Sequence, residues 1–171
     1  MKKKLFVLSL LLLNSLLFSQ NNNIKYIEYL SYGSSRTKGL NFGIYYPNNW
    51  RSSTGDHLDI IRKFETQNGV MFTVSIKKLE KAPTNNELDI FYSYNFQKEY
   101  VEGPEVKKMG INSKLLNYKK SFIDALPAAI TTVYSEFENA GISTNSKAIL
   151  FSFFYKDYYI TLTGQIKGSE K

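Results

Sequence analysis

The stretch of sequence that decides the fold is Gly39–Trp50, GLNFGIYYPNNW. Its apolar side chains alternate at Phe42, Ile44 and Tyr46, and a period of two predicts a strand with one buried face. Pro47 and the two asparagines after it predict a turn at the end of this strand. Working outward, we predict that this strand starts a single antiparallel sheet to which the later strands belong.

The start of the chain has the layout of a secretory signal peptide. A positively charged start, Lys2–Lys4, precedes an apolar run over Leu5–Leu13, and small or polar residues follow. The run is shorter than the roughly 20 apolar residues of a membrane-spanning helix. We expect residues 1–19 to be a signal peptide, residues 20–38 an N-terminal lead-in segment and residues 39–171 one domain. The protein is then exported, periplasmic or secreted, and has no transmembrane anchor after cleavage.

Composition narrows the possible chemistry and partners. The 171 residues include no cysteine, which excludes disulfides and thiol catalysis. Three of the 22 basic residues lie in the predicted leader, so the formal charge falls from +7 to +4 without it. The lysine pairs also lack the stacking aromatic residues of nucleic-acid-binding proteins. We therefore expect no nucleic-acid partner.

A β-hairpin is predicted in the middle of the chain. Leu58, Ile60 and Phe64 share one parity, and the alternation resumes over Val70–Ile76. The Asn-Gly pair between the two runs supplies the positive φ angles that a tight hairpin turn needs.

Helical signals surround this hairpin. Thr84 and Glu87 have the spacing of a capping box, and apolar residues then recur at helical spacing over residues 88–100 before a Gly-Pro pair. We predict one helix there, with its aromatic side turned to the sheet. Near the start, Ile24–Tyr32 has apolar residues three apart, which predicts a short amphipathic helix or an irregular flap.

The rest of the chain is predicted to be β-structure, in four strands over residues 115–123, 128–137, 148–155 and 158–166. The last two form a hairpin about Lys156-Asp157. Ile149–Tyr155 carries large apolar groups on both parities, which is typical of a central strand covered on both sides. The predicted fold is therefore α+β, an antiparallel β-sheet between helical layers in an α/β/α sandwich.

Three motifs in this order resemble those of a known family. They are Phe42, Ile44, Tyr46, Pro47 and Trp50 in the first strand, the turn Asp124–Ala128 with its Pro-Ala pair, and the late strand Tyr158–Thr161. Together they resemble the PsbP-like family over roughly residues 39–165. Two features depart from that family: Ala125 stands where a glycine is usual, and no final helix follows the last strand.

The resemblance implies a fold and a kind of role. The implied fold is an antiparallel sheet between helical layers. Plant members are non-catalytic extrinsic subunits of the oxygen-evolving photosystem, and many bacterial relatives are exported proteins. No set of functional residues carries over, because the matching positions are core and turn residues.

Candidate catalytic residues are sparse in this sequence. His57 is the only histidine; with Asp59 it could begin a metal site, but such sites need three or four ligands. Glu136 and Glu138 share one face of a predicted strand, a pattern more typical of a solvated edge than of a glycosidase. We expect no catalytic residue, no cofactor and no metal, and therefore a protein that is not an enzyme.

The aromatic residues carry the functional prediction, with core packing as the alternative interpretation. We predict a partner or ligand surface that includes Trp50, Tyr155, Tyr158 and Tyr159. The predicted function is an exported accessory or binding module of the bacterial cell envelope, whose partner is another envelope protein or a second copy. The alternatives are a lipid or glycan carrier with an aromatic-rich face and, more weakly, a hydrolase using the single histidine. A sheet face left open by the missing final helix could also be covered by Ile24–Tyr32.

Overall fold

The computed structural model of the chain describes residues 6–9, 24–139 and 142–168. The strands are β1 (Phe6–Ser9), β2 (Tyr26–Leu30), β3 (Phe42–Pro47), β4 (Arg51–Ser53), β5 (Ile60–Glu65), β6 (Met71–Lys78), β7 (Ile111–Ile123), β8 (Leu126–Asn139), β9 (Ile142–Tyr155) and β10 (Tyr158–Lys167). The helices are a short 3-10 helix, η2 (Ser35–Thr37), and α1 (Asn85–Phe91), α2 (Tyr94–Glu102) and α3 (Pro104–Lys108).

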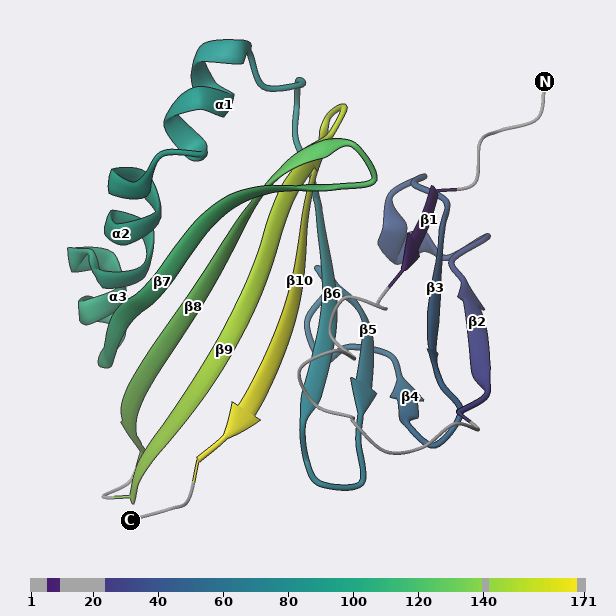
Figure 1. Cartoon of the computed structure of the whole chain (residues 1–171), viewed down its shortest axis with the longest axis horizontal. Coiled ribbons are helices and arrows are strands. Elements are labelled where there is room, and N and C mark those ends of the chain that lie inside the picture. Colours follow the sequence, from purple (N-terminus) through teal and green to yellow (C-terminus); the bar gives the residue numbers. More distant parts are fainter. Residues whose placement is uncertain (1–5, 10–23, 140–141, 169–171) are drawn as a thin grey trace.

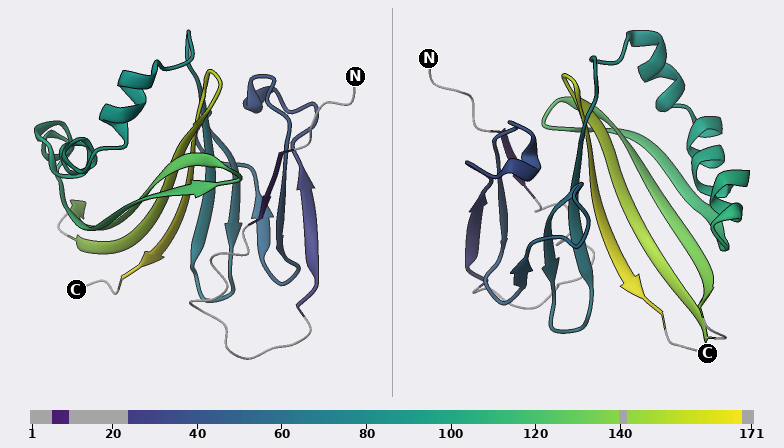
Figure 2. Two further views of the ribbon diagram at one scale, coloured as in Figure 1. Left: turned by 45° about the horizontal axis from the view of Figure 1, so that its top comes forward. Right: turned by 180° about the vertical axis from the view of Figure 1, so that it is seen from behind.

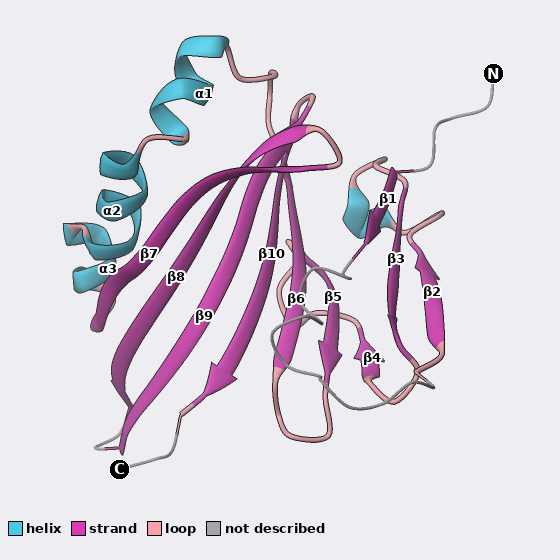
Figure 3. Ribbon diagram, viewed as in Figure 1, coloured by secondary structure: helices cyan, strands magenta, loops and turns pink. Residues whose placement is uncertain are grey.

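The strands form two separate sheets (Figure 1, Figure 3). The large sheet is antiparallel, with seven strands in the order β4-β5-β6-β10-β9-β8-β7. The small sheet has three strands in the order β1-β3-β2, and its β1–β3 pair is parallel. The prediction of a single sheet is therefore wrong, because β3, the strand that was predicted to start it, belongs to the small sheet.

The two faces of the large sheet are covered by different layers. The three α-helices lie on one side and the small sheet on the other, as two further views confirm (Figure 2). The main core lies between the sheets, and its most deeply buried side chains include Ile44 of β3, Phe64 of β5, Ile76 of β6 and Phe153 of β9. The predicted sandwich between two helical layers is thus correct for one face only, since a β-sheet forms the other layer.

The segment predicted to be a short helix or flap explains this difference. Residues 26–30 form β2, which pairs with β3 and places the ring of Tyr29 against Phe42 and Phe64. Tyr29 and Ser31 point toward the core, whereas Ile27 is 44% exposed, and Ser31 is polar, so the segment lacks a clear apolar period of two. Ser31 is buried because its hydroxyl accepts a hydrogen bond from the Phe42 backbone N–H at 2.9 Å. A segment of the predicted lead-in therefore covers part of the large sheet.

The hairpin between β5 and β6 confirms the Asn-Gly prediction. Gly69 has a φ of +76° in the turn, and its backbone N–H donates to the Thr66 carbonyl at 3.1 Å. One detail differs: a β-bulge between Ile60 and Arg62 shifts the alternation. Ile61 is therefore the buried residue of this strand start, and Leu58 is exposed.

The predicted single helix is two helices in the structure. The capping box of Thr84 and Glu87 is present at the start of α1, as predicted. Ser93 then interrupts the helix and caps α2, because its hydroxyl accepts the Phe96 backbone N–H at 3.2 Å. Gly103 separates α2 from α3; a Cβ there would lie 2.2 Å from the Glu99 carbonyl oxygen, so only glycine fits.

The helices pack on the outer strands of the large sheet. Val101 of α2 contacts Leu115 and Val133 in a second, smaller core cluster. The Leu115 backbone N–H also donates to a carboxylate oxygen of Glu102 at 2.8 Å. β9 lies between β8 and β10 and is apolar on both faces: Phe153 faces the small sheet, while Phe154 contacts Phe91 of α1. The prediction of a central strand covered on both sides is confirmed.

The turn between β7 and β8 predicts a stabilising substitution. Asp124 and Ala125 are the two turn residues between the paired Ile123 and Leu126, and both have positive φ, 47° and 64°. Alanine in this conformation costs about 1–2 kcal/mol, whereas glycine does not. Glycine's greater freedom in the unfolded chain offsets about half of that gain. Because residue 125 is exposed and no packing is lost, we expect Ala125→Gly to raise the free energy of unfolding by about 0.5–1 kcal/mol in urea denaturation. No change, or a loss of stability, would contradict the turn geometry.

Candidate docking surface

The four aromatic residues predicted to form a partner surface do not share one surface. Trp50 is buried, and its ring stacks on Phe72 with centroids 4.7 Å apart and an interplanar angle of 7°. Tyr158 is also buried, and its hydroxyl donates to the Lys38 carbonyl at 2.9 Å, which ties β10 to the loop before β3. Both side chains therefore hold the two sheets together.

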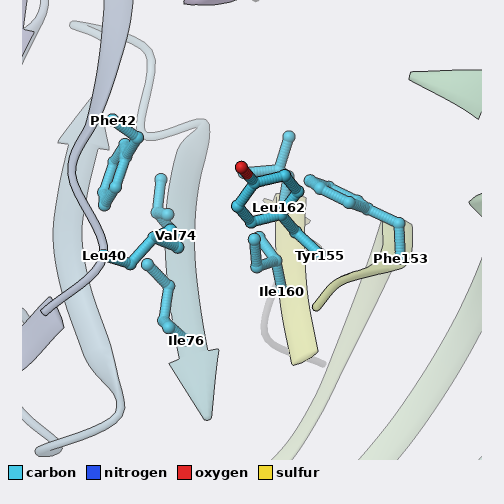
Figure 4. A pocket seen from close by; sticks show the side chains of 8 residues that line it. All are labelled: Leu40, Phe42, Val74, Ile76, Phe153, Tyr155, Ile160 and Leu162. Atoms are coloured by element: carbon cyan, nitrogen blue, oxygen red, sulfur yellow. The ribbon is translucent and has the colours of Figure 1, made fainter. Parts of the chain in front are cut away.

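Tyr155 lines a narrow apolar cleft between the two sheets (Figure 4). The side chains around it come from both sheets: Leu40, Phe42, Val74, Ile76, Phe153, Tyr155, Ile160 and Leu162. The centre of a water-sized sphere has only about 20 Å³ of free space in the cleft, which is little more than one water molecule needs. In this arrangement the cleft is part of the packed core and is too small for a lipid or glycan.

Tyr159 lies on the opposite face of the large sheet, under the helices. Its ring is 5.6 Å from that of Phe91 and 5.1 Å from that of Phe154. The neighbouring Tyr92 is buried beside this cluster and donates its hydroxyl to the Pro127 carbonyl at 2.6 Å. Through these contacts α1 packs against the large sheet, so the aromatic residues here have a structural role.

The outer face of the small sheet presents a different set of large apolar side chains. Tyr26, Leu30 and Tyr45 are 41%, 43% and 36% exposed. The register pairs Glu28 with Tyr45 and Leu30 with Gly43, so these side chains are cross-strand neighbours on one face. We call this set, Tyr26, Glu28, Leu30 and Tyr45, the outer face of the small sheet. A contiguous exposed apolar surface of this kind marks an interaction site more often than scattered apolar residues do.

The outer face carries one acidic group among its apolar side chains. A hydrogen bond with Glu28 raises the pKa of the Tyr45 hydroxyl above its usual value, and the charge of that carboxylate adds to the effect. The pair fixes the orientation of the ring beside the strand edge. This surface was not predicted from the sequence, because Ile24–Tyr32 was expected to form a short helix or flap instead of a strand.

The residues considered for catalysis are not brought together. His57 is exposed, and its carbonyl accepts a hydrogen bond from Arg36 at 3.1 Å. Asp59 pairs instead with the Lys38 ammonium at 2.7 Å. Glu136, at an exposed position of β8, accepts a hydrogen bond from the Tyr134 hydroxyl at 2.8 Å. Within the described residues, no three His, Cys, Asp or Glu side chains are grouped so that they could hold a metal ion.

A second apolar surface is an open groove of about 470 Å³ along α2 and α3. It is lined by Phe96, Glu99, Tyr100, Gly103, Pro104, Glu105, Val106 and Met109. The rings of Phe96 and Tyr100 stack with centroids 6.4 Å apart and an interplanar angle of 11°. The groove therefore offers an aromatic wall on the helical side of the molecule, opposite the small sheet.

The likeness to PsbP that the sequence motifs predicted is confirmed at the level of the fold. The solution structure of cyanobacterial PsbP (CyanoP) from Synechocystis sp. PCC 6803 matches with a TM-score of 0.52 and 14% identity, covering 87% of this chain and 85% of that one. A crystal structure from Bacteroides thetaiotaomicron VPI-5482 matches with a TM-score of 0.39 and 14% identity, over 74% of this chain and 38% of the other.

The likeness to PsbP is found by comparison of structures and not by comparison of sequences. No family model matches the chain, and no curated protein matches it. At 14% identity the likeness to cyanobacterial PsbP concerns the fold alone, so the chain has a PsbP-like fold. None of the helices in the described residues combines the length and apolar character needed to cross a membrane.

Proposed function

We propose that this chain is an exported, non-enzymatic accessory protein of the bacterial cell envelope, which docks on another envelope protein through the outer face of its small sheet. Export is supported by the basic start and short apolar run of the leader. An accessory role is supported by the PsbP-like fold, since plant members of the family that the sequence resembles are non-catalytic extrinsic subunits.

The single observation that carries the docking site is the exposed row of Tyr26, Leu30 and Tyr45. Tyrosine combines a large apolar area with few rotatable bonds, and it is enriched in protein interfaces for that reason. The row lies on a regular, paired sheet and not on a loop, so it is held rigid before binding. A preformed apolar surface favours a protein partner over a small ligand.

The test compares two double variants of the full chain, expressed with an affinity tag in a bacterial host of the same type. Leu30→Ser with Tyr45→Ser alters the outer face; Ile90→Ser with Tyr94→Ser makes the same chemical changes on the exposed side of the helices. We expect one envelope protein to be recovered with the wild type and the helix variant, and to fall by about tenfold with the outer-face variant. Urea denaturation of both variants checks that they remain folded.

Two results would contradict the proposal. Equal recovery of the partner with both double variants would place the interface elsewhere. If mass spectrometry shows that the protein from the envelope fraction still carries residues 1–19, export with cleavage of the leader is contradicted.

The alternative function, a small-molecule carrier, is favoured by one observation, the groove with its stacked Phe96 and Tyr100. Its volume lies within the range of small-ligand sites, about 300–1,000 Å³. Native mass spectrometry of the same purified material separates the two functions: a carrier shows a bound small molecule that is lost in a Phe96→Ala variant, and a docking protein does not.

A further inference from the structure

β3 pairs with β2 along one edge, and its other edge faces away from β2. The Ser31 N–H donates to the Phe42 carbonyl at 3.0 Å, and the Asn48 N–H donates to the Lys25 carbonyl at 2.9 Å. Even-numbered residues of β3 therefore direct their backbone groups to β2. Because backbone groups alternate between the two edges of a strand, those of Gly43 and Tyr45 point to the opposite edge.

The structure places a short apolar strand on that edge. β1, with the sequence FVLS, runs parallel to β3 and pairs Phe6 with Phe42 through to Ser9 with Tyr45. The pairing stops before Pro47, which has no N–H to offer and therefore limits the length of any added strand. The edge thus accepts an extended apolar segment of about four residues.

This strand lies inside the predicted signal peptide, residues 1–19. Cleavage of the leader removes β1, and among the described residues no other strand pairs with the edge to which Gly43 and Tyr45 direct their backbone groups. The deepest members of the core between the sheets, Ile44, Phe64 and Phe153, belong to β3, β5 and β9. An unpaired, regular edge beside an exposed apolar face is a template for strand addition.

We infer that, in the exported protein, the β3 edge binds an extended apolar segment of the partner protein, which runs parallel to β3 and takes the place of β1. This inference rests on the proposed function, because only cleavage of the leader opens the edge. Register places the partner residues opposite Gly43 and Tyr45 on the outer face, next to Leu30. Strand addition therefore extends the outer face of the small sheet and gives the partner main-chain hydrogen bonds as well as apolar contacts.

The orientation of β1 favours a different protein over a second copy. Two identical edge strands related by a twofold axis pair antiparallel, because the axis reverses the direction of one of them. The segment that the structure seats on β3 is parallel. An extended apolar segment of a different protein can pair parallel to β3, because no twofold axis fixes its direction.

The experiment uses the processed protein recovered from the envelope fraction, with its N-terminus identified by mass spectrometry. The probe is a synthetic peptide, KKLFVLS, which reproduces residues 3–9; its two native lysines favour solubility. Amide hydrogen exchange is followed by NMR with and without the peptide. We expect the Gly43 and Tyr45 amides to exchange about tenfold more slowly with peptide bound, while the Ile44 amide, bonded to β2, is unchanged.

Two variants separate backbone pairing from side-chain contact. Tyr45→Pro removes an N–H that faces the open edge and is expected to weaken peptide binding by about tenfold. Tyr45→Thr keeps the N–H, has a residue suited to strands, and is expected to retain binding within about twofold. If the proline variant does not fold, the exchange data on the wild type decide alone.

The outcomes distinguish this inference from the proposed function. A processed protein whose Gly43 and Tyr45 amides do not respond to the peptide overturns strand addition and leaves the accessory role in place. Protection of the Ile44 amide alone, or equal binding by the proline variant, also overturns it. A leader that stays attached overturns both, because β1 then keeps the edge closed.

Discussion

Truncation of Phe64 to alanine is expected to lower the free energy of unfolding by about 3–5 kcal/mol. Phe64 is 0% exposed, and its ring centroid lies 4.7 Å from that of Tyr46 and 6.5 Å from that of Tyr29. These two tyrosines belong to the small sheet, whereas Phe64 belongs to the large one. The substitution therefore opens a cavity at the contact between the sheets. A domain of this size has about 5–15 kcal/mol of stability, so the loss is a large fraction of the total.

The chain offers a control of the same residue type for this substitution. Phe122 lies near the end of β7 and is 65% exposed. Phe122→Ala removes the same atoms from a solvated position and is expected to change the stability by less than about 0.5 kcal/mol. Urea denaturation followed by circular dichroism measures both variants. A similar loss for the two phenylalanines would mean that the core does not lie between the sheets.

Features set by neighbouring residues could be predicted from the sequence. The Asn-Gly pair fixes the β5–β6 turn because it accepts positive φ, and Thr84 with Glu87 fixes the start of α1 because the two groups satisfy each other's backbone donors. The long hairpins β7–β8 and β9–β10 follow in the same way from tight turns between strongly alternating runs. In each case the partners are close in sequence, so the pattern and the contact coincide.

Features set by distant residues could not be predicted in the same way. The alternation of Phe42, Ile44 and Tyr46 predicts a strand with a buried face, but it is equally compatible with pairing in either sheet. The assignment to the small sheet depends on β2, whose inward row includes the polar Ser31. The hydrogen bonds of that serine with Leu40 and Phe42 exist only after the two strands meet. The identity of the second covering layer therefore depends on tertiary contacts.

The candidate site depends on register in the same way. Tyr45 is outward because Ile44 and Tyr46 are inward, which the sequence alone indicates. That Leu30 and Glu28 lie beside it follows from the β2–β3 register, and that its backbone faces the edge on which β1 pairs follows from the β1–β3 register. The predicted surface residues Trp50 and Tyr158 are instead buried, since large aromatic side chains stabilise a core more strongly than smaller ones.

Stability is expected to fall in alkaline solution because of Tyr92. Burial raises the pKa of the Tyr92 hydroxyl to about 12, against a smaller opposing effect of the Phe154 backbone, while the ordinary value is 10.0. The unfolded chain therefore releases this proton first, so the stabilisation is complete below about pH 10 and is lost as the pH rises toward about 12. The full difference between the two pKa values corresponds to about 2–3 kcal/mol, of which about half is lost by about pH 11.

The Tyr92→Phe variant isolates this contribution from those of other tyrosines and lysines. At about pH 8 the variant lacks the 2.6 Å hydrogen bond to the Pro127 carbonyl and is expected to be about 1–2 kcal/mol less stable than the wild type. At about pH 11 the wild type has lost about 1.4 kcal/mol through ionisation in the unfolded state, so the two proteins become nearly equal. Urea denaturation at both pH values measures the difference. A stability gap that stays constant with pH would show that the Tyr92 hydroxyl is not buried at the contact between α1 and the large sheet.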